Sequence, residues 1–389
     1  FQAEDGIRDV ERSRGLGDVY KRQRLYPSKQ QEEKLLWTLD KCRFTYNLLL
    51  ENLNKQDKPS KLKFQSMLPE LKNQYPELKE VYSKVLQYEC HRLFSNLKAL
   101  SRLKKNGKKV GKLRFKTKNR FKTMVYNQLG FKIIYTGKRC QTLHLSKIGN
   151  IKVRIPKKQT IKGKIKQVII KRYPSGKWFS IICVDIKAKI KQKPIKKKIG
   201  IDVGIKHFLT DSEGRQIENP LFYEKLLYKL QYEQKKLSRK QKGSKNREKQ
   251  RIRVARIYEK IVNKRDDFLH KLSRFYANNY DFIAVEDLNI KNMVKNHRLA
   301  RMIIDSSWNK FIQLLSYKVE STGGKVVRVN PRGTSKEYKY GKLDRDYNAS
   351  LNILERGLSG QGLSFEPVET RPLREILASL VVEAGSPIL

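Results

Sequence analysis

Three carboxylates in the second half of the chain occupy positions where acidic side chains can support metal chemistry. Asp202 and Glu286 each end a short apolar run typical of a buried strand, and Asp346 lies just before a predicted final helix. A carboxylate there loses hydration, so its charge is costly unless a cation neutralises it. Mg²⁺ or Mn²⁺ prefers carboxylate oxygens together with water and phosphate, and two such ions about 3.5–4 Å apart can activate water and stabilise a leaving oxygen. The three acids are therefore predicted catalytic residues and ligands of two ions.

Each acid also has an ordinary structural interpretation. Asp202 can be a turn residue, Glu286 a strand-end acid paired with a lysine, and Asp346 a helix cap or first-turn acid. The three positions are 84 and 60 residues apart in sequence, so spacing alone does not bring them together. From the residues themselves, both interpretations stay open.

The elements that must position these acids follow the pattern of an α/β domain, in which strands alternate with long helices. The predicted elements are a strand around Asp202 closed by a turn at 212–214, helical segments from about 223 to 276, a strand at 282–288, a helix at 306–321, a strand at 325–331, and a final helix at about 348–356 ended by Gly357.

The first half of the chain is predicted to be helical and then β-rich. Ser28 is expected to cap a long helix, and two further helical patterns follow at about 61–73 and 76–103. Between about 125 and 186 the apolar period becomes that of strands, with a hairpin turn at 173–177.

Two segments are interpreted as connections or additions. Residues 187–198 hold seven lysines and are expected to link two domains. Residues 1–23 balance five basic against five acidic side chains and begin with Phe1. We interpret them as a non-native leader, translated from adapter read-through, and exclude them from the fold, with a genuine flexible arm as the alternative.

The charge of the chain identifies the class of partner. The sequence has 87 Lys and Arg against 38 Asp and Glu, a formal net charge of +49, which calls for a polyanion. The longest apolar run, Trp178–Val184, is far shorter than the ~20 residues of a spanning helix, so nucleic acid is favoured over a membrane. The four cysteines are scattered without a C-x-x-C pair, which predicts a reducing compartment and neither disulfides nor a thiolate zinc site.

Two basic runs are candidate phosphate-binding segments. Lys104–Lys118 has eight basic residues in 15, and Gln234–Arg253 has ten with one glutamate. A solvated surface is the alternative, but the excess charge makes phosphate contact the better interpretation, with an affinity that falls steeply with salt. The predicted nucleic-acid contacts are Lys112, Arg114, Lys116, Arg239 and Lys240.

Four motifs in order, GIDVGIKHFLTD, FIAVEDLNIKNM, NPRGTS and DRDYNASLNIL, resemble the consecutive RuvC motifs of the TnpB family. These are IS200/IS605-type, transposon-encoded, RNA-guided endonucleases related to type V CRISPR effectors. RLYPSKQQEEKL and CRFTYNLLLE near the start are also similar, so the resemblance runs from about residue 24 to the end. Carried over, Asp202, Glu286 and Asp346 fall on the family's three metal-binding acids. Arg332 in NPRGTS is a candidate phosphate contact, with a simple loop role equally open.

The resemblance implies an α/β plus mixed α+β architecture. A β-barrel-like wedge domain with a helical recognition insert would span 24–195, a RuvC, RNase H-like nuclease domain 196–358, and a tail 359–389. The implied partners are a guide RNA of the omega type, with one chain per RNA, and double- and single-stranded target DNA, cut next to a short flanking motif. The expected setting is the prokaryotic cytoplasm, at the nucleoid and without a membrane.

One departure from the family pattern bears on activity. TnpB proteins normally carry a zinc ribbon of two C-x-x-C pairs between NPRGTS and DRD, but the interval 336–343 has no cysteine, so no zinc is predicted. A cleavage-impaired RNA- and DNA-binding transposon regulator is the first alternative, which the intact acids disfavour. A DDE transposase is the second, which the long basic insert between the first two acids disfavours.

Overall fold

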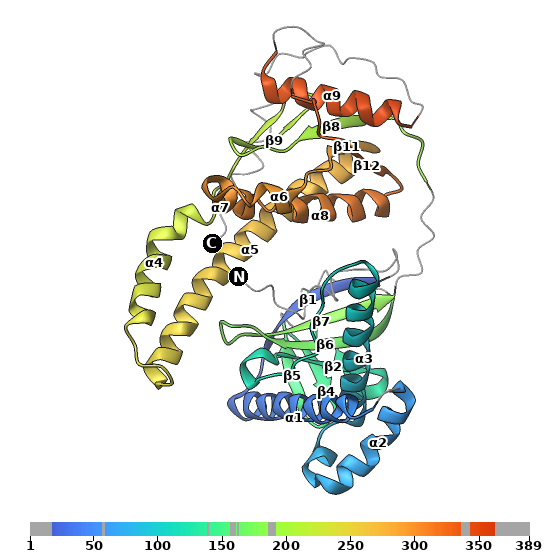
Figure 1. Ribbon diagram of the computed structural model, residues 1–389, viewed down its shortest axis with the longest axis vertical. Helices are drawn as coiled ribbons and strands as arrows, with labels where there is room; N and C mark the ends of the chain where they lie inside the picture. Colours follow the sequence, from blue (N-terminus) through green and yellow to red (C-terminus); the bar gives the residue numbers. More distant parts are fainter. Residues whose placement is uncertain are drawn as a thin grey trace. The chain divides into compact units, whose positions relative to one another are not determined.

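The computed structural model describes residues 18–56, 59–137, 140–155, 161, 163–185, 192–335 and 343–361. These residues form two compact units that divide between residues 188 and 189, inside the lysine-rich segment 187–198 (Figure 1). Among the described residues, the helices are all too short or too polar to span a bilayer. The interval 336–342, where the zinc ribbon of TnpB proteins would stand, lies outside the described residues.

The first unit is built on one antiparallel sheet of seven strands in the order β2-β6-β7-β1-β5-β4-β3. The strands are β1 (Asp18–Tyr26), β2 (Thr123–Asn127), β3 (Phe131–Ile134), β4 (Gln141–Leu145), β5 (Gly149–Val153), β6 (Lys164–Arg172) and β7 (Trp178–Asp185). The predicted hairpin turn joins β6 to β7, where the Tyr173 amide donates to the Lys177 carbonyl at 2.8 Å. Gly176 supplies the positive φ of 83° that this turn requires.

Strand β1 corrects one part of the interpretation of the first 23 residues, the exclusion of residues 18–23 from the fold. Asp18 pairs with Asp185 and the register continues to Leu25 opposite Trp178, so residues 18–23 form a paired part of the sheet along β7. A ladder of backbone hydrogen bonds needs no particular side chain, which is why the composition of this segment gave no sign of it. Excluding residues 18–23 from the fold was therefore wrong, and residues 1–17 lie outside the described part.

Two helices, α1 (Lys29–Asn54) and α3 (Ser83–Lys105), pack against the sheet of the first unit, and α2 (Lys61–Gln74) packs on α3, with a short 3₁₀ helix at Pro76–Glu80 before α3. Ser28 caps α1 as predicted, in a capping box with Gln31. Leu35 and Tyr46 of α1, Leu86 of α3 and Trp178 of β7 belong to one buried cluster. This cluster joins helices and sheet into a single core.

Glu89 on α3 is a fully buried acid in this core. Its Oε2 lies 3.0 Å from Nη1 of Arg92, whose guanidinium also donates to the Thr123 carbonyl at 3.0 Å and lies over the Phe121 ring. Burial raises the pKa of Glu89 to about 7, against the opposing charge of Arg92. The folded chain therefore holds a proton that the unfolded chain releases near pH 4.5.

We expect Glu89→Gln to remove a pH dependence of stability. Between about pH 4.5 and 7 the folded state binds more protons than the unfolded state, so the free energy of unfolding falls as pH rises, by up to ~1.4 kcal/mol per unit. The variant should be more stable than the parent at pH 8 by a few kcal/mol, with a smaller difference at pH 5, in urea denaturation. The exposed Glu70→Gln is the matched control, and an equal pH response in parent and variant would contradict the assignment.

The second unit is built on a five-stranded mixed sheet in the order β10-β9-β8-β11-β12. The strands are β8 (Lys198–Asp202), β9 (His207–Asp211), β10 (Gln216–Glu218), β11 (Phe282–Glu286) and β12 (Lys325–Val329). Strands β8, β11 and β12 run parallel, and β9 and β10 add antiparallel edges.

Helices cover both faces of this sheet, as Figure 1 shows. Ile283 and Val285 of β11 pack in the cluster that includes Leu269 of α5 and Leu315 of α8, whereas Phe282 and Ala284 pack with α9. Alternate residues of one strand thus face opposite layers. The helices are α4 (Glu224–Ser238), α5 (Lys245–Asn279), α6 (Ile290–Met293), α7 (His297–Ser306), α8 (Trp308–Ser321) and α9 (Arg345–Ser359).

Two predicted helix boundaries differ from the structure. Ser307 has a left-handed backbone with φ of 55°, so the helix expected at 306–321 begins only at Trp308, after the separate helix α7. The final helix starts at Arg345 and continues through Gly357. A Cβ at Gly357 would lie 2.6 Å from the Cβ of Ala284, so this glycine marks a close approach of helix to sheet and not a helix end.

Candidate functional site

The backbone brings the three predicted acids to one end of the second sheet. Strands β8 and β11 are parallel neighbours with Ile201 opposite Val285, so their next residues, Asp202 and Glu286, end the two strands side by side. Asp346 lies in the first turn of α9, which packs across these strands with Gly200 against Ser350. Acids that are far apart in sequence therefore share one edge of the sheet.

The electrostatics of Asp202 show that the other two acids act on it. Loss of hydration is the largest cause that raises the pKa of Asp202 to about 7, and the negative charges of Glu286 and Asp346 raise it further. A hydrogen bond from the Val203 amide and the charge of Arg345 oppose the rise. Repulsion from two other carboxylates requires both to be close, so the structure groups what sequence spacing left apart.

The residue types at this edge suit a hard divalent cation. Three carboxylates supply oxygen ligands of the kind that Mg²⁺ and Mn²⁺ prefer, and a cation would relieve the repulsion on Asp202. Within the described ranges, however, no three His, Cys, Asp or Glu side chains are already arranged to hold a metal ion. The donor set fits a metal by its chemistry, and binding itself stays a prediction.

Thr334 holds Glu286, a contact that the sequence did not indicate. The Thr334 hydroxyl is buried and lies 2.5 Å from Oε1 of Glu286, to which it can donate. Asn352 of α9 donates to the Thr334 carbonyl at 2.8 Å and so ties this loop to the helix that carries Asp346. Burial raises the pKa of Glu286, and this hydrogen bond and the charge of Arg356 oppose the rise. The signal available in the sequence was the threonine of NPRGTS.

Two other acids stand beside the three without joining them. Asp344 caps α9, and its Oδ1 accepts from the amides of Asp346 at 3.1 Å and Tyr347 at 3.2 Å, which fixes the turn that presents Asp346. Asp287 is exposed, with its Oδ1 3.1 Å from Nη1 of Arg328. The first positions the site, and the second belongs to the surface.

Arg332 lies on the exposed surface of the loop that follows β12. Its amide donates to Oδ1 of Asn330 at 3.0 Å, and its carbonyl accepts from Nη1 of Arg356 at 2.7 Å. The backbone of Arg332 therefore shapes the loop, and phosphate contact by its guanidinium stays a prediction.

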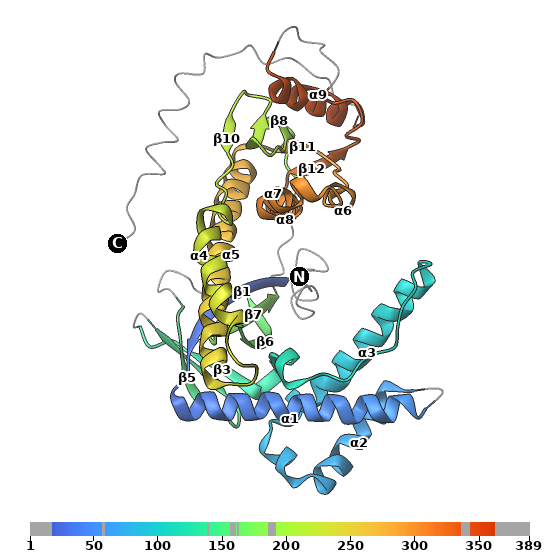
Figure 2. The same ribbon diagram turned by 60° about the vertical axis from the view of Figure 1, so that its left-hand side comes forward.

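The other predicted nucleic-acid contacts lie at exposed or half-buried positions in each unit. Lys112 and Arg114 are exposed in the segment after α3, and Lys116 there is anchored through its amide, which donates to Oδ1 of Asn47 at 2.9 Å. In the second unit Arg239 is exposed at the end of α4 and Lys240 follows it. Figure 2 shows α4 and α5 side by side as a helical pair, so these last two residues lie near its tip.

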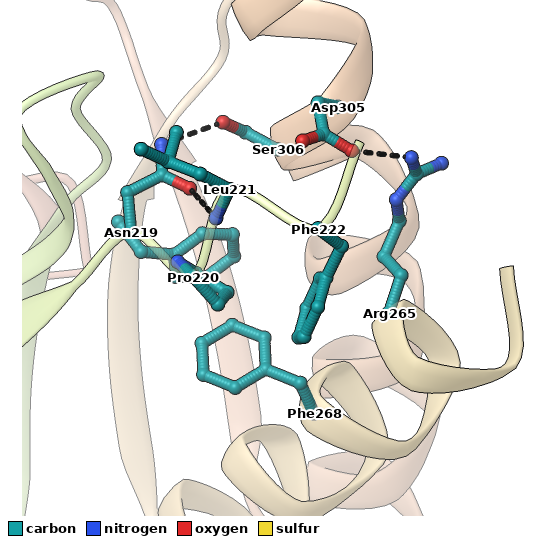
Figure 3. Close-up of a pocket in the computed structure, with 9 residues that line it drawn as sticks. Asn219, Pro220, Leu221, Phe222, Arg265, Phe268, Asp305 and Ser306 are labelled. Atoms are coloured by element: carbon teal, nitrogen blue, oxygen red, sulfur yellow. Dashed lines mark hydrogen bonds and ion pairs between the residues drawn. The ribbon is translucent and has the colours of Figure 1, made fainter. Parts of the chain in front are cut away.

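The base of the α4–α5 pair is fastened to α7 (Figure 3). Asp305 is buried, forms an ion pair with Arg265 of α5, and accepts from the Tyr223 amide at 2.9 Å. Asn219 donates to the Ser306 hydroxyl at 3.1 Å, next to Leu221 with its positive φ of 46°. These polar contacts set the direction in which α4 leaves the body of the unit.

We expect Asp305→Ala to lower the free energy of unfolding of the second unit by about 3 kcal/mol. Removing one partner of a buried ion pair leaves the other charge uncompensated, here Arg265. Asp267→Ala breaks an exposed pair with Lys271 and should change stability by at most ~0.5 kcal/mol. Denaturation monitored by hydrogen exchange in α4 and α5 measures this free energy for both variants. An equal loss of stability in the two would show that Asp305 does not fasten the helical pair.

Three parts of the chain match described families. Residues 181–297 match the IS605 OrfB family, described as a probable transposase. Residues 308–353 match a Cas12f1-like TNB domain, and residues 20–58 match a helix-turn-helix domain. Within that last range, residues 20–56 as described hold the end of β1 and the single helix α1, so the helix-turn-helix description does not fit their structure.

Two relatives extend the match. A protein of Streptomyces pristinaespiralis named "Putative RNA-guided DNA endonuclease" is 35% identical over 235 residues, 54% of this chain and 56% of that protein. The Escherichia coli (strain K12) protein InsQ, with the same description, is 30% identical over 340 residues, 81% of each chain. The chain thus spans little more than half of the first relative and most of the second.

Two solved structures are similar at lower levels. A Cas12f1–sgRNA–target DNA complex gives a TM-score of 0.46 at 14% identity, over 87% of this chain and 99% of that one. A CRISPR-Cas12f ternary complex gives a TM-score of 0.33 at 16% identity, over 91% and 85%. The sequence matches, rather than these distant likenesses, establish the relationship.

Proposed function

The chain belongs to the TnpB family, and from that premise we propose that it is an RNA-guided DNA endonuclease that cuts with Asp202, Glu286 and Asp346. The five-stranded sheet with its two helical layers would be the RuvC, RNase H-like nuclease domain. The seven-stranded sheet with α1–α3 would be the wedge domain with its helical recognition insert. The family relationship and the relatives named as endonucleases support this assignment.

One observation carries the location of the cutting centre. The pKa of Asp202 is raised to about 7 by lost hydration and by the charges of Glu286 and Asp346. Protein folding tolerates such crowding of like charges mainly where a function requires it. Three carboxylates at one edge of the sheet, two of which act on the third, support a site that binds a divalent cation and phosphate.

The chain's own residues would prepare the site for phosphodiester hydrolysis. Thr334 keeps one Glu286 oxygen fixed, and the cap of Asp344 fixes the turn of Asp346. Asp202, Glu286 and Asp346 would hold two Mg²⁺ or Mn²⁺ ions, whose positive charge would polarise the scissile phosphate and lower the pKa of water. In the reaction the attacking water would give up a proton as its oxygen bonds to phosphorus, one P–O ester bond would break, and the leaving oxygen would take up a proton.

The choice of target would come from base pairing and not from the protein. Basic side chains such as Arg114 and Arg239 would hold phosphates, which carry no sequence information. A guide RNA of the omega type, one per chain, would pair with one DNA strand while the protein reads a short flanking motif. Acting on DNA in this way, the protein would work at the nucleoid of a prokaryotic cell.

The test is cleavage of a plasmid library by the protein purified with its co-expressed RNA. The library carries one target matched to the guide and randomised flanking sequence, with Mg²⁺ or with EDTA. We expect cutting only with Mg²⁺, only with the matched guide, and next to a restricted set of flanking sequences. Co-purified RNA without cutting in any arm would favour a cleavage-impaired regulator, and absence of bound RNA would remove the guided mechanism.

A further inference from the structure

A shallow, open groove lined by α5 and α8 has the composition of an anion-binding site. Its volume is about 750 Å³, within the range of ~300–1,000 Å³ typical of ligand sites. Figure 1 shows α5 and α8 next to each other in the layer below the sheet. The residues that line the groove are His270, Lys271, Arg274, Phe275, Asn278, Asn279, Tyr317 and Lys318. Three of these eight are Lys or Arg and none is acidic.

The groove is separate from the three acids. Its α5 residues lie in the last turns of that helix, which ends at Asn279 and leads into β11 at Phe282. Glu286 stands at the other end of the same strand, about 13 Å away at ~3.3 Å per residue. The lining residues therefore belong to the opposite end of the strand from the proposed cutting centre.

Lys318 places a buried positive charge at the floor of the groove. The residue is only 3% exposed, and its Nζ donates at 2.7 Å to both the His270 carbonyl and the Ser273 hydroxyl. An ammonium has three N–H groups, and the contacts found in the described part of the chain use two. Burial, and then the charge of Arg274, lower the pKa of Lys318 to about 8. A buried cation with a cationic neighbour favours an incoming anion.

The rim of the groove adds the groups that recognise a nucleotide. Arg274 is exposed and close enough for its charge to act on both Lys318 and Tyr317. A guanidinium binds phosphate oxygens in a bidentate way, and the ring of Tyr317, 42% exposed, is a surface on which a base can stack. Lys271 adds a second exposed cation, held 2.9 Å from Asp267 by an ion pair of little strength.

We propose that the α5–α8 groove binds the phosphodiester backbone of a single-stranded polynucleotide, at a site separate from the cutting centre. Arg274 and Lys271 hold the phosphate at the rim, Lys318 supplies the charge beneath it, and Tyr317 stacks on a neighbouring base. The inference rests on the proposed function, which supplies two possible sources of such a strand. These are an unpaired part of the guide RNA and a displaced strand of the target DNA.

The test measures binding of fluorescent twelve-residue oligouridine and oligothymidine to the full chain, freed of RNA at high salt. Anisotropy titrations at several salt concentrations compare the parent with Lys271→Gln/Arg274→Gln and with Tyr317→Ala. A matched control, Lys260→Gln/Lys264→Gln, removes the same charge from exposed positions of α5 outside the groove.

We expect the groove pair to weaken binding by about tenfold and to reduce the salt slope by ~1.4, for two contacts at ~0.7 each. Tyr317→Ala should weaken binding without changing that slope. If the groove variants bind both probes more weakly, the groove recognises the phosphodiester backbone that RNA and DNA share. If they lose affinity for oligouridine alone, the bound strand is the guide RNA, and if for oligothymidine alone, it is the DNA strand. Equal losses in the groove pair and the control, or unchanged binding, would overturn the proposal.

Two further measurements keep the outcomes distinct. Circular dichroism melts of each variant detect unfolding, and Lys271→Gln/Arg274→Lys, which keeps one of the two charges but not the guanidinium, should recover part of the affinity lost in the groove pair. The titrations do not depend on cutting. If the parent does not cleave DNA with Mg²⁺, the proposed nuclease activity fails. The binding result for the groove can still be interpreted by itself.

Discussion

Asp202→Ala is expected to lower the rate of target DNA cleavage by about a thousandfold or more, while the variant still co-purifies with its RNA. Asp202 is the acid on which the other two act, since the charges of Glu286 and Asp346 both raise its pKa. Removing it takes a central ligand from a proposed two-metal site, in which the ions stabilise both the attacking and the leaving oxygen. The loss should appear in single-turnover cleavage of a matched linear target at saturating Mg²⁺.

Asp287→Ala is the matched control for this change. It removes one carboxylate next to Glu286, but Asp287 is exposed and paired with Arg328, so cleavage should stay within about threefold of the parent. If Asp202→Ala cuts as fast as this control, the acids are not the cutting centre. If the variant also loses its RNA or its melting transition, the result reports folding and the isosteric Asp202→Asn takes its place.

Gly200→Ala should have the second largest effect, because it separates the elements that carry two of the acids. A Cβ at Gly200 would lie inside van der Waals contact of the Ser350 carbonyl oxygen and 2.8 Å from the Cβ of Leu354, so α9 must move away from β8. Overpacking of this kind costs about 1–3 kcal/mol, and a rigid backbone neighbour places this position at the upper end. Asp202 and Asp346 lie on the two displaced elements, so cleavage should fall more than stability alone accounts for.

Gly111→Ala is the control for the same chemical change. A Cβ at Gly111 meets nothing within 4 Å, and substitution there should leave both the melting temperature and the cleavage rate close to those of the parent. Melting curves and single-turnover rates measured on the same preparations separate the two effects. A Gly200→Ala protein that melts and cuts like the Gly111→Ala protein would show that α9 tolerates displacement.

The sequence was sufficient to place Asp202 and Glu286 at strand ends, because each follows a short apolar run typical of a buried strand. Bringing them together required the register of β8 on β11, which depends on pairing between segments more than 80 residues apart. The motif resemblance supplied that grouping indirectly. Thr334 was missed because the role of a hydroxyl depends on the group it contacts. That group, Glu286, is 48 residues away in the sequence.

The errors at element ends have physical causes as well. Residues 18–23 pair through their backbone, so neither the charge balance nor the unusual start of residues 1–23 revealed a strand. At the final helix, Asp344 and Asp346 are both residue types that can cap a helix, and in the structure Asp344 is the N-cap. Gly357 has the usual signature of a helix end, but here the absence of a side chain lets α9 approach Ala284.

The α4–α5 pair has a consequence for how such a chain can be extended. Asp202 and Glu286 end adjacent parallel strands, and the crossover between those strands includes the whole α4–α5 pair. Arg247 closes its tip by donating to the Leu237 and Lys240 carbonyls at 2.8 and 2.7 Å. Because the entropy of closing a connection grows slowly with its length, a foreign domain spliced between residues 241 and 244 leaves both strands in register. The loop at the tip is thus a site where evolution or an engineer can insert an additional domain without disturbing the acids.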